Sequence, residues 1–132
     1  MSNQEVGGTH VAFSKRVKAM QTRMGSRAMY AEVDDSGSWY RPIDGSLRDF
    51  IQRKTTMVFA TASADGQPYV QHRGGPPGFL HVLDEQTIAF ADFEGNRQYI
   101  SRGNIEENPR AQFLLVEYAT RTRVKIWGPA RP

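Results

Sequence analysis

The segment Phe90 to Arg97, FADFEGNR, combines residue types that could bind an anion. It has the pattern of a strand that ends in an acidic, glycine-containing turn and leads directly into a helix, with Asn96 and Arg97 at the junction. The first N–H groups of a helix lack intrahelical partners, the helix dipole is positive there, and an arginine can add charge-assisted hydrogen bonds. The pattern therefore favours a phosphorylated ligand. An arginine after a turn is more often a solvated surface residue, and that simpler interpretation stays open.

Other side chains that could do chemistry are scattered. The three histidines, His10, His72 and His81, lie too far apart in sequence for a local metal motif. The chain has no cysteine, which excludes disulfides, thiolate nucleophiles and cysteine-ligated metals. The serines show neither a nucleophile elbow nor an adjacent base. We therefore expect no metal site and can name no catalytic acid, base or nucleophile.

Length and charge narrow the class of protein. A chain of 132 residues suits one domain with one core, which a partner could share. The formal net charge is +3, but residues 1–30 carry five Lys/Arg against one acidic residue, residues 119–132 carry four against none, and the middle carries eight against thirteen. Basic charge at the two ends differs from the basic stripe of a nucleic-acid-binding surface. We expect no nucleic-acid partner.

Targeting and membrane-spanning signals are also missing from the sequence. The first ten residues, MSNQEVGGTH, do not place a charged region before an apolar one. No apolar run approaches the length that crosses a bilayer. Together with the lack of cysteine, these features predict a soluble cytoplasmic protein with no membrane partner.

The N-terminal part of the chain predicts helices and a loop. Residues 11–24 predict an amphipathic helix, because valine and methionine side chains partly fit one face and basic side chains occupy the others. Residues 32–45 are polar and turn-rich and predict an ordered loop. Ser46, followed three residues later by Asp49, predicts the N-cap of a short helix that ends near Lys54.

After this helix the pattern changes to alternation typical of strands. The Asp65-Gly66 pair predicts a tight hairpin turn, and residues 96–107 predict one intervening helix. Strands are expected at residues 55–63, 68–73, 79–83, 87–91, 111–118 and 123–128. The short links exclude a parallel, doubly wound sheet. The sequence predicts a mainly β (α+β) fold, a six-stranded antiparallel split β-barrel with flanking helices.

Three segments together resemble a known family. They are the hairpin ATASADGQPYVQHRGG, the strand–turn–helix FADFEGNRQYISRGNIEENPRAQFLL and the closing RVKIWGPAR. Their order and spacing are similar to those of the pyridoxamine 5′-phosphate oxidase-like proteins, the FMN-binding split-barrel family, from about Gly45 to the end. The resemblance implies a homodimer with FMN in a groove between the subunits. It gives one FMN-binding domain over residues 1–132, with an N-terminal helical extension over about residues 1–45.

The resemblance also assigns cofactor-binding residues. Asn96, Arg97 and Gln98 fall where the family has a Ser-Arg-Lys-type tripeptide that holds the FMN phosphate, so the family's lysine is replaced by an uncharged glutamine. Gln71 or Arg73 would meet the phosphate or the ring edge from the strand after the first hairpin. Arg123 falls where a family glutamine touches the cofactor, and a solvated position for it is an equal alternative. The following Gly74-Gly75-Pro76-Pro77-Gly78 departs from the oxidase members, so oxidation of pyridoxamine phosphate is not the expected activity.

The function that these residues favour is an FMN-dependent oxidoreductase of unknown small-molecule substrate. The alternative is a non-catalytic protein that binds or senses a flavin, a deazaflavin or haem on the same barrel. The chain ends at Pro132, directly after the last expected strand, where relatives continue into substrate-contacting segments. We expect either that a C-terminal part is missing or that other residues select the substrate.

Overall fold

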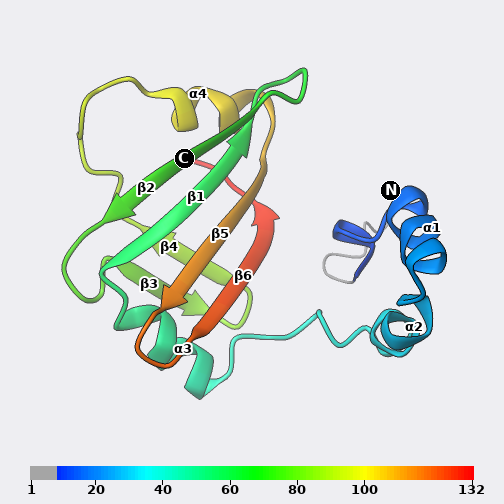
Figure 1. Cartoon of the computed structure of the whole chain (residues 1–132). Helices are drawn as coiled ribbons and strands as arrows, with labels where there is room; N and C mark the ends of the chain where they lie inside the picture. Colours follow the sequence, from blue (N-terminus) through cyan, green and yellow to red (C-terminus); the bar gives the residue numbers. More distant parts are fainter. Residues whose placement is uncertain (1–8) are drawn as a thin grey trace. The chain divides into compact units, whose positions relative to one another are not determined.

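The structure, a computed structural model, describes residues 9–132 (Figure 1). Contacts between backbone positions divide the chain into two compact units, Met1–Arg41 and Pro42–Pro132. Each unit is considered by itself below. The interpretation of the chain as one domain with an N-terminal extension stays a prediction. No helix within residues 9–132 has the length and apolar character needed to cross a membrane.

The first unit is a helical hairpin. A short 3-10 helix, η1 (Thr9–Val11), precedes α1 (Lys15–Met24) and α2 (Arg27–Ser36). Helix α1 confirms most of the helix predicted at residues 11–24. The loop predicted from residue 32 is wrong over its first part, because α2 continues to Ser36 and ends at Gly37 in the left-handed conformation. An ion pair of 2.6 Å between Arg27 and Asp34 joins residues two turns apart on this helix and favours its continuation.

The second unit begins with α3 (Gly45–Gln52), close to the predicted position. Its N-cap is Asp44, so the prediction of Ser46 as the cap is wrong. The Asp44 carboxylate accepts hydrogen bonds of 2.8 Å from the backbone N–H of Leu47 and from the hydroxyl of Ser46. A carboxylate at this position satisfies a free helix N–H and also interacts with the positive end of the dipole, so it displaces the serine from that role.

The six predicted strands are present among the described residues, and all their pairings are antiparallel. Four strands form one sheet in the order β2-β1-β5-β6, and β3 and β4 form a second sheet. No strand pairing joins the two sheets within residues 9–132, so the hydrogen-bonded ladder does not close into one barrel. The strands are β1 (Thr56–Ala62), β2 (Pro68–Gly74), β3 (Leu80–Asp84), β4 (Thr87–Phe90), β5 (Arg110–Glu117) and β6 (Thr122–Pro129).

The core lies between the two sheets. Phe59 on β1, Phe90 on β4 and Phe113 on β5 pack edge to face, with ring centroids 5.2–5.6 Å apart. Helix α3 lies along β3: its Gln52 accepts a hydrogen bond from the backbone N–H of Val82, and its Arg48 donates to the Val82 carbonyl. These side chains therefore satisfy backbone groups on the outer edge of β3.

Helix α4 (Ile100–Glu107) follows β4 after a long exposed segment that Figure 1 shows as the wide loop between them. The predicted start at Asn96 is wrong. Arg97 and Tyr99 both have positive φ angles, 59° and 56°, in the left-handed region. That conformation cannot continue as a right-handed helix, so regular structure begins only at Ile100.

Candidate functional site

Two of the predicted site residues lie on the inner face of the edge strand β2. Gln71 and Arg73 pair across the backbone with Phe59 and Met57, which are buried, whereas His72 between them is exposed. The alternation of β2 therefore turns Gln71 and Arg73 toward β4 and α4. His72 therefore lies on the opposite face of β2 from these two residues.

The Gln71 side chain is part of the attachment of α4 to the sheet. Its amide oxygen accepts a hydrogen bond of 3.0 Å from the hydroxyl of Ser101, which is buried. One turn later, the Asn104 side-chain amide donates to the Thr61 hydroxyl at 3.0 Å, and Thr61 is also buried. These hydrogen bonds hold α4 against β1 and β2, and they leave the Gln71 NH₂ group as its available donor.

Arg73 bridges the gap between the two sheets. Its guanidinium forms an ion pair with Asp92 just after β4 and lies 5.8 Å from the centre of the Phe90 ring. The side chain is only 16% exposed, and its buried Nε has no hydrogen-bond partner among residues 9–132. A buried donor without a partner is rare and costly, so this arginine has hydrogen-bonding capacity that the described protein atoms do not use.

Next to Arg73, the chain passes through Gly75 at a point of close approach. A β-carbon at Gly75 would lie 2.7 Å from Cβ of Phe79 and 3.1 Å from Cε2 of Phe93. The Gly75 N–H donates to the Thr55 carbonyl at 3.0 Å, which fixes the backbone there. Glycine is therefore needed because two aromatic side chains converge on its α-carbon.

The predicted tripeptide Asn96, Arg97 and Gln98 lies in the exposed loop and not on the first turn of α4. Arg97 pairs with Glu94, and the two side chains are 67% and 63% exposed. Asn96 accepts a hydrogen bond of 3.3 Å from the Gln98 backbone N–H, which stabilises the turn itself. The free helix N–H groups expected beside Arg97 are thus displaced to the residues after Tyr99.

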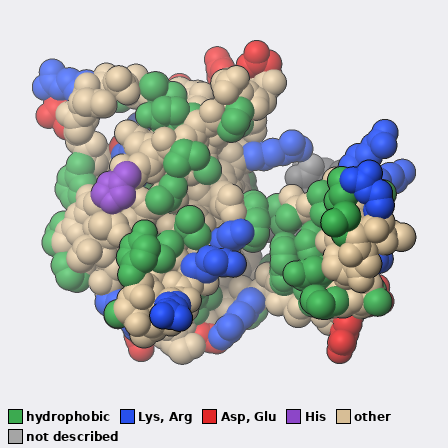
Figure 2. Space-filling view, viewed as in Figure 1, with side chains coloured by type: hydrophobic (Ala, Val, Ile, Leu, Met, Phe, Trp, Pro, Cys, Tyr) green, Lys and Arg blue, Asp and Glu red, His purple; other side chains and the backbone are tan. Residues whose placement is uncertain are grey.

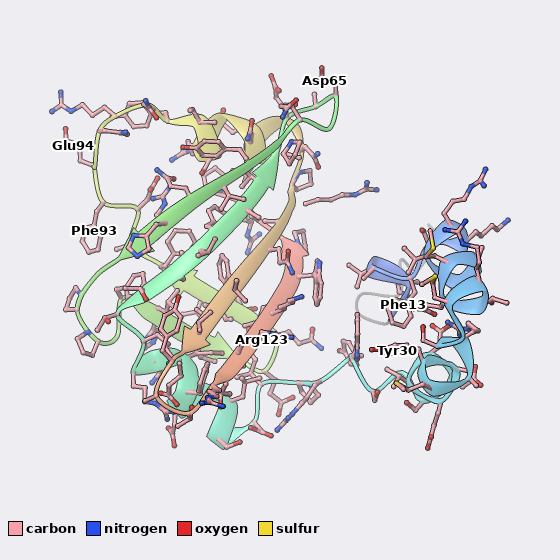
Figure 3. The ribbon with its side chains drawn as sticks, viewed as in Figure 1. Phe13, Tyr30, Asp65, Phe93, Glu94 and Arg123 are labelled. Atoms are coloured by element: carbon pink, nitrogen blue, oxygen red, sulfur yellow. The ribbon has the colours of Figure 1, made fainter. Side chains whose placement is uncertain are left out.

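Arg123 lies apart from the other predicted residues. It is exposed on β6, and its cross-strand neighbour is Val116. The adjacent Val124 packs on the core, so Arg123 belongs to the opposite, outer face of the sheet. Figure 3 shows it at the β6 edge, well separated from Phe93 and Glu94 in the loop. Within one chain the structure does not bring Arg123 to the β2 site.

Residues that the sequence patterns did not identify complete the site. Asp92 and Phe93 contact the end of β2, and Ser101 holds Gln71. Asp92 and Phe93 belong to the FADFEGNR segment, whose acidic turn was recognised. Their partners lie about 20 residues earlier in the chain, so only the pairing of the two sheets identifies those contacts.

The largest pKa shift occurs away from this site. Hydrogen bonds from Thr120 and Lys54, together with Arg53, lower the pKa of Glu117 to about 2. Lys54 is buried, donates to Glu117 at 3.1 Å and lies 4.3 Å from the centre of the Phe50 ring. This cluster joins the end of α3 to β5, which indicates a structural role.

The site residues fit the phosphate end of FMN better than a metal ion. Arg73 and Arg97 pair with acidic residues only two positions apart, Asp92 and Glu94, so both guanidinium groups lie at one short loop. Arginine is suited to phosphate recognition, and the unused Arg73 donor belongs to this set. No group of three or more potential metal-ligating side chains is found in the part of the chain that the structure describes.

The fold agrees with a family match. The sequence profile described as Pyridoxamine 5′-phosphate oxidase matches residues 43–132. The chain belongs to this family. The match begins at the start of the second unit and includes every predicted site residue. Proteins of the family are typically dimers and commonly bind flavin.

Solved structures give weaker likenesses. Two tagged forms of HupZ from group A Streptococcus share 24% identity with this chain, cover 66% of it and superpose with TM-scores of 0.51 and 0.50. HutZ from Vibrio cholerae, the heme storage protein, shares 19% identity over 67% of this chain, with a TM-score of 0.45. The chain spans 67%, 63% and 61% of these three structures. The two HupZ structures show a shared fold alone. No curated protein matches the chain.

Proposed function

We propose that this protein is an FMN-dependent oxidoreductase acting on a small molecule that is not yet identified. The observation that carries this proposal is Arg73 on β2: its side chain is only 16% exposed, and its Nε has no hydrogen-bond partner among residues 9–132. A second arginine, Arg97, lies on the loop whose Asp92 pairs with Arg73. Bound FMN would supply the transfer of hydride or electrons. The chain would hold its phosphate, orient its ring and shape the cavity around it.

Each predicted residue has a definite role in this proposal. Arg73 and Arg97 hold the phosphate, and Asn96 and Gln98 order the turn around it and can add hydrogen bonds. The NH₂ group of Gln71 addresses the ring edge. Asp92 and Glu94 pair with the two arginines in the structure, so a phosphate has to share or displace these carboxylates. Binding should therefore weaken as the salt concentration rises.

A homodimer with the cofactor at the interface is part of the proposal. In a dimer, Arg123 of one copy reaches the site of the other copy only if its outer sheet face packs on the other copy's loop between β4 and α4. That outer face carries a partly apolar surface suited to burial, formed by Val58, Ala60, Val70, Leu114, Val116 and Trp127. A monomer in light scattering at micromolar concentration would contradict the shared site.

The alternative from another class is a non-catalytic protein that binds flavin, deazaflavin or haem. An absorbance spectrum before and after addition of FMN and desalting separates these cases. Retained bands in the blue and near ultraviolet support a flavoprotein, whereas a Soret band indicates haem. Turnover with chemical reductants and acceptors then separates an enzyme from a binding protein.

The phosphate site has a matched pair of variants. Arg97→Ala should weaken FMN binding by about 1.5–3 kcal/mol, the scale of a hydrogen bond to a charged group. Arg102→Ala is the control, because Arg102 is an exposed arginine paired with Glu106 on nearby α4. Titration of FMN by fluorescence measures both. Equal affinity in the Arg97 and Arg102 variants would remove Arg97 from the site.

A further inference from the structure

The segment between β4 and α4 is fastened to the end of β2 at two successive residues. Asp92 pairs with Arg73, and the next residue, Phe93, approaches Gly75. Every residue from Ala91 to Ile100 is exposed. The start of the segment is therefore held in place while its side chains remain open to solvent.

Phe93 stands out within this segment because it is a large apolar side chain in an exposed position. One edge of its ring lies against Gly75, and the side chain as a whole is 56% exposed. Phe79, on the other side of the same glycine, is only 7% exposed. Two phenylalanines thus converge on one α-carbon, but one belongs to the core and the other presents its ring to solvent.

The neighbours of Phe93 indicate what its ring could meet. The residue before it, Asp92, pairs with Arg73, a largely buried cation with an unused donor. Behind the ring is Gly75, whose missing side chain leaves the room that Phe79 and one edge of the Phe93 ring occupy. An exposed aromatic ring and a cation held beside the same segment are together complementary to a ligand that joins a planar ring to an anionic group.

We propose that Phe93 is the residue against which the planar ring of the ligand packs, and that it contributes to affinity independently of the phosphate-binding arginines. This inference rests on the proposed function, because FMN is the ligand through which it acts. The contact with Gly75 uses only one edge of the Phe93 ring. The exposed face of that ring is therefore available to pack against a ligand.

The experiment compares FMN with riboflavin, which has the same ring and no phosphate. Phe93→Ala should weaken both ligands about tenfold, because it removes the ring contact. Arg97→Ala should weaken FMN and leave riboflavin unchanged. Phe93→Tyr should retain wild-type affinity for both. Isothermal calorimetry gives the dissociation constants, and the position of the flavin absorption band reports the environment of the ring without any activity assay.

Tyr118→Ala is the matched control, since Tyr118 is another exposed aromatic residue, 87% exposed, at the far end of β5. It should change neither affinity. Near-ultraviolet circular dichroism and light scattering establish that each variant is folded and has the wild-type oligomeric state.

The outcomes separate the two proposals. If the wild-type protein binds neither flavin, the proposed function fails. If the wild-type protein binds FMN and Phe93→Ala binds it equally well, the proposed function stands and the role of Phe93 is overturned. Loss of affinity that coincides with loss of the dimer would also overturn it, because Phe93 would then be a contact between copies.

Discussion

The two units of the chain differ in how their side chains are buried. The second unit, Pro42–Pro132, contains a core of eight buried apolar residues from its sheets, α3 and the residue before β3. In the first unit, neither α1 nor α2 has a buried residue. Figure 2 shows hydrophobic side chains at the surface of both units. The comparison teaches that regular secondary structure alone does not create a core, since elements distant in the chain must also pack against one another.

Local contacts hold the first unit together. Phe13 packs against Tyr30 and Trp39, with ring centroids 5.7 and 4.9 Å away. Asp34 forms ion pairs with Lys18 and Arg27, each at 2.6 Å. Figure 3 shows Phe13 and Tyr30 facing one another. Partly exposed pairs of this kind contribute little individually, so most of the stability should come from the second unit.

The largest expected effect therefore comes from the core of the second unit. Phe59→Ala removes a ring that is 2% exposed and contacts Phe90 and Phe113. We expect a loss of about 3–5 kcal/mol in the free energy of unfolding. Urea denaturation followed by circular dichroism measures it.

Phe13→Ala tests the other side of the comparison. Both ring contacts of Phe13 lie within the first unit, and its expected cost is about 1 kcal/mol. If Phe13→Ala destabilised the protein as much as Phe59→Ala, the contrast between the units would be wrong.

A pair of glycine variants tests how tightly the second unit packs near the site. Gly75→Ala should cost about 1–3 kcal/mol, because its β-carbon would lie 2.7 Å from Cβ of Phe79. Gly103→Ala is the control: it lies inside α4 with no atom within 4 Å of the added carbon, and it should stabilise by about 0.5–1 kcal/mol. Thermal unfolding measures the stability of both variants. An unchanged melting temperature in Gly75→Ala would refute the close approach of Phe79 to Gly75.

The smallest expected effect is the pH dependence of the stability of the second unit. The pKa of Glu117 is about 2 in the folded chain and has an ordinary value of 4.5. Because the pKa is lower in the folded chain than in the unfolded chain, ionised Glu117 stabilises the fold at pH values above 4.5. That stability is lost as the pH falls toward 2. The pKa values of Asp65 and Asp84 are also lowered by hydrogen bonds, so they act in the same direction.

The measurement is the urea midpoint at several pH values from about 6 to about 3, where we expect a steady decrease. Glu117→Gln should lower the midpoint at the upper pH and flatten the profile. Glu106→Gln, which changes an exposed pair on α4, should leave the profile unchanged. If the urea midpoint of Glu117→Gln fell with pH as steeply as that of the wild type, the pH dependence would belong to other groups.

Much of the second unit could be predicted from its sequence. Strong β-formers around Phe59 and the Asp65-Gly66 turn are local signals, and the corresponding strands lie within one or two residues of the expected positions. Helix α4 ends at Glu107, the predicted last residue. The errors occur where several local solutions compete. Asp44 and Ser46 could each cap α3, and positive φ angles at Arg97 and Tyr99 delayed the start of α4.

The sequence by itself determined the family and the six antiparallel strands, and it proposed the two arginines of the candidate site. Alternation and turn residues act over a few positions, so these features are encoded locally. Only the tertiary structure decided that Arg73 meets Asp92, that Phe93 covers Gly75, and that Arg123 lies on the opposite face. Those relations depend on how the β3–β4 sheet packs against the larger one, which joins residues far apart in the chain.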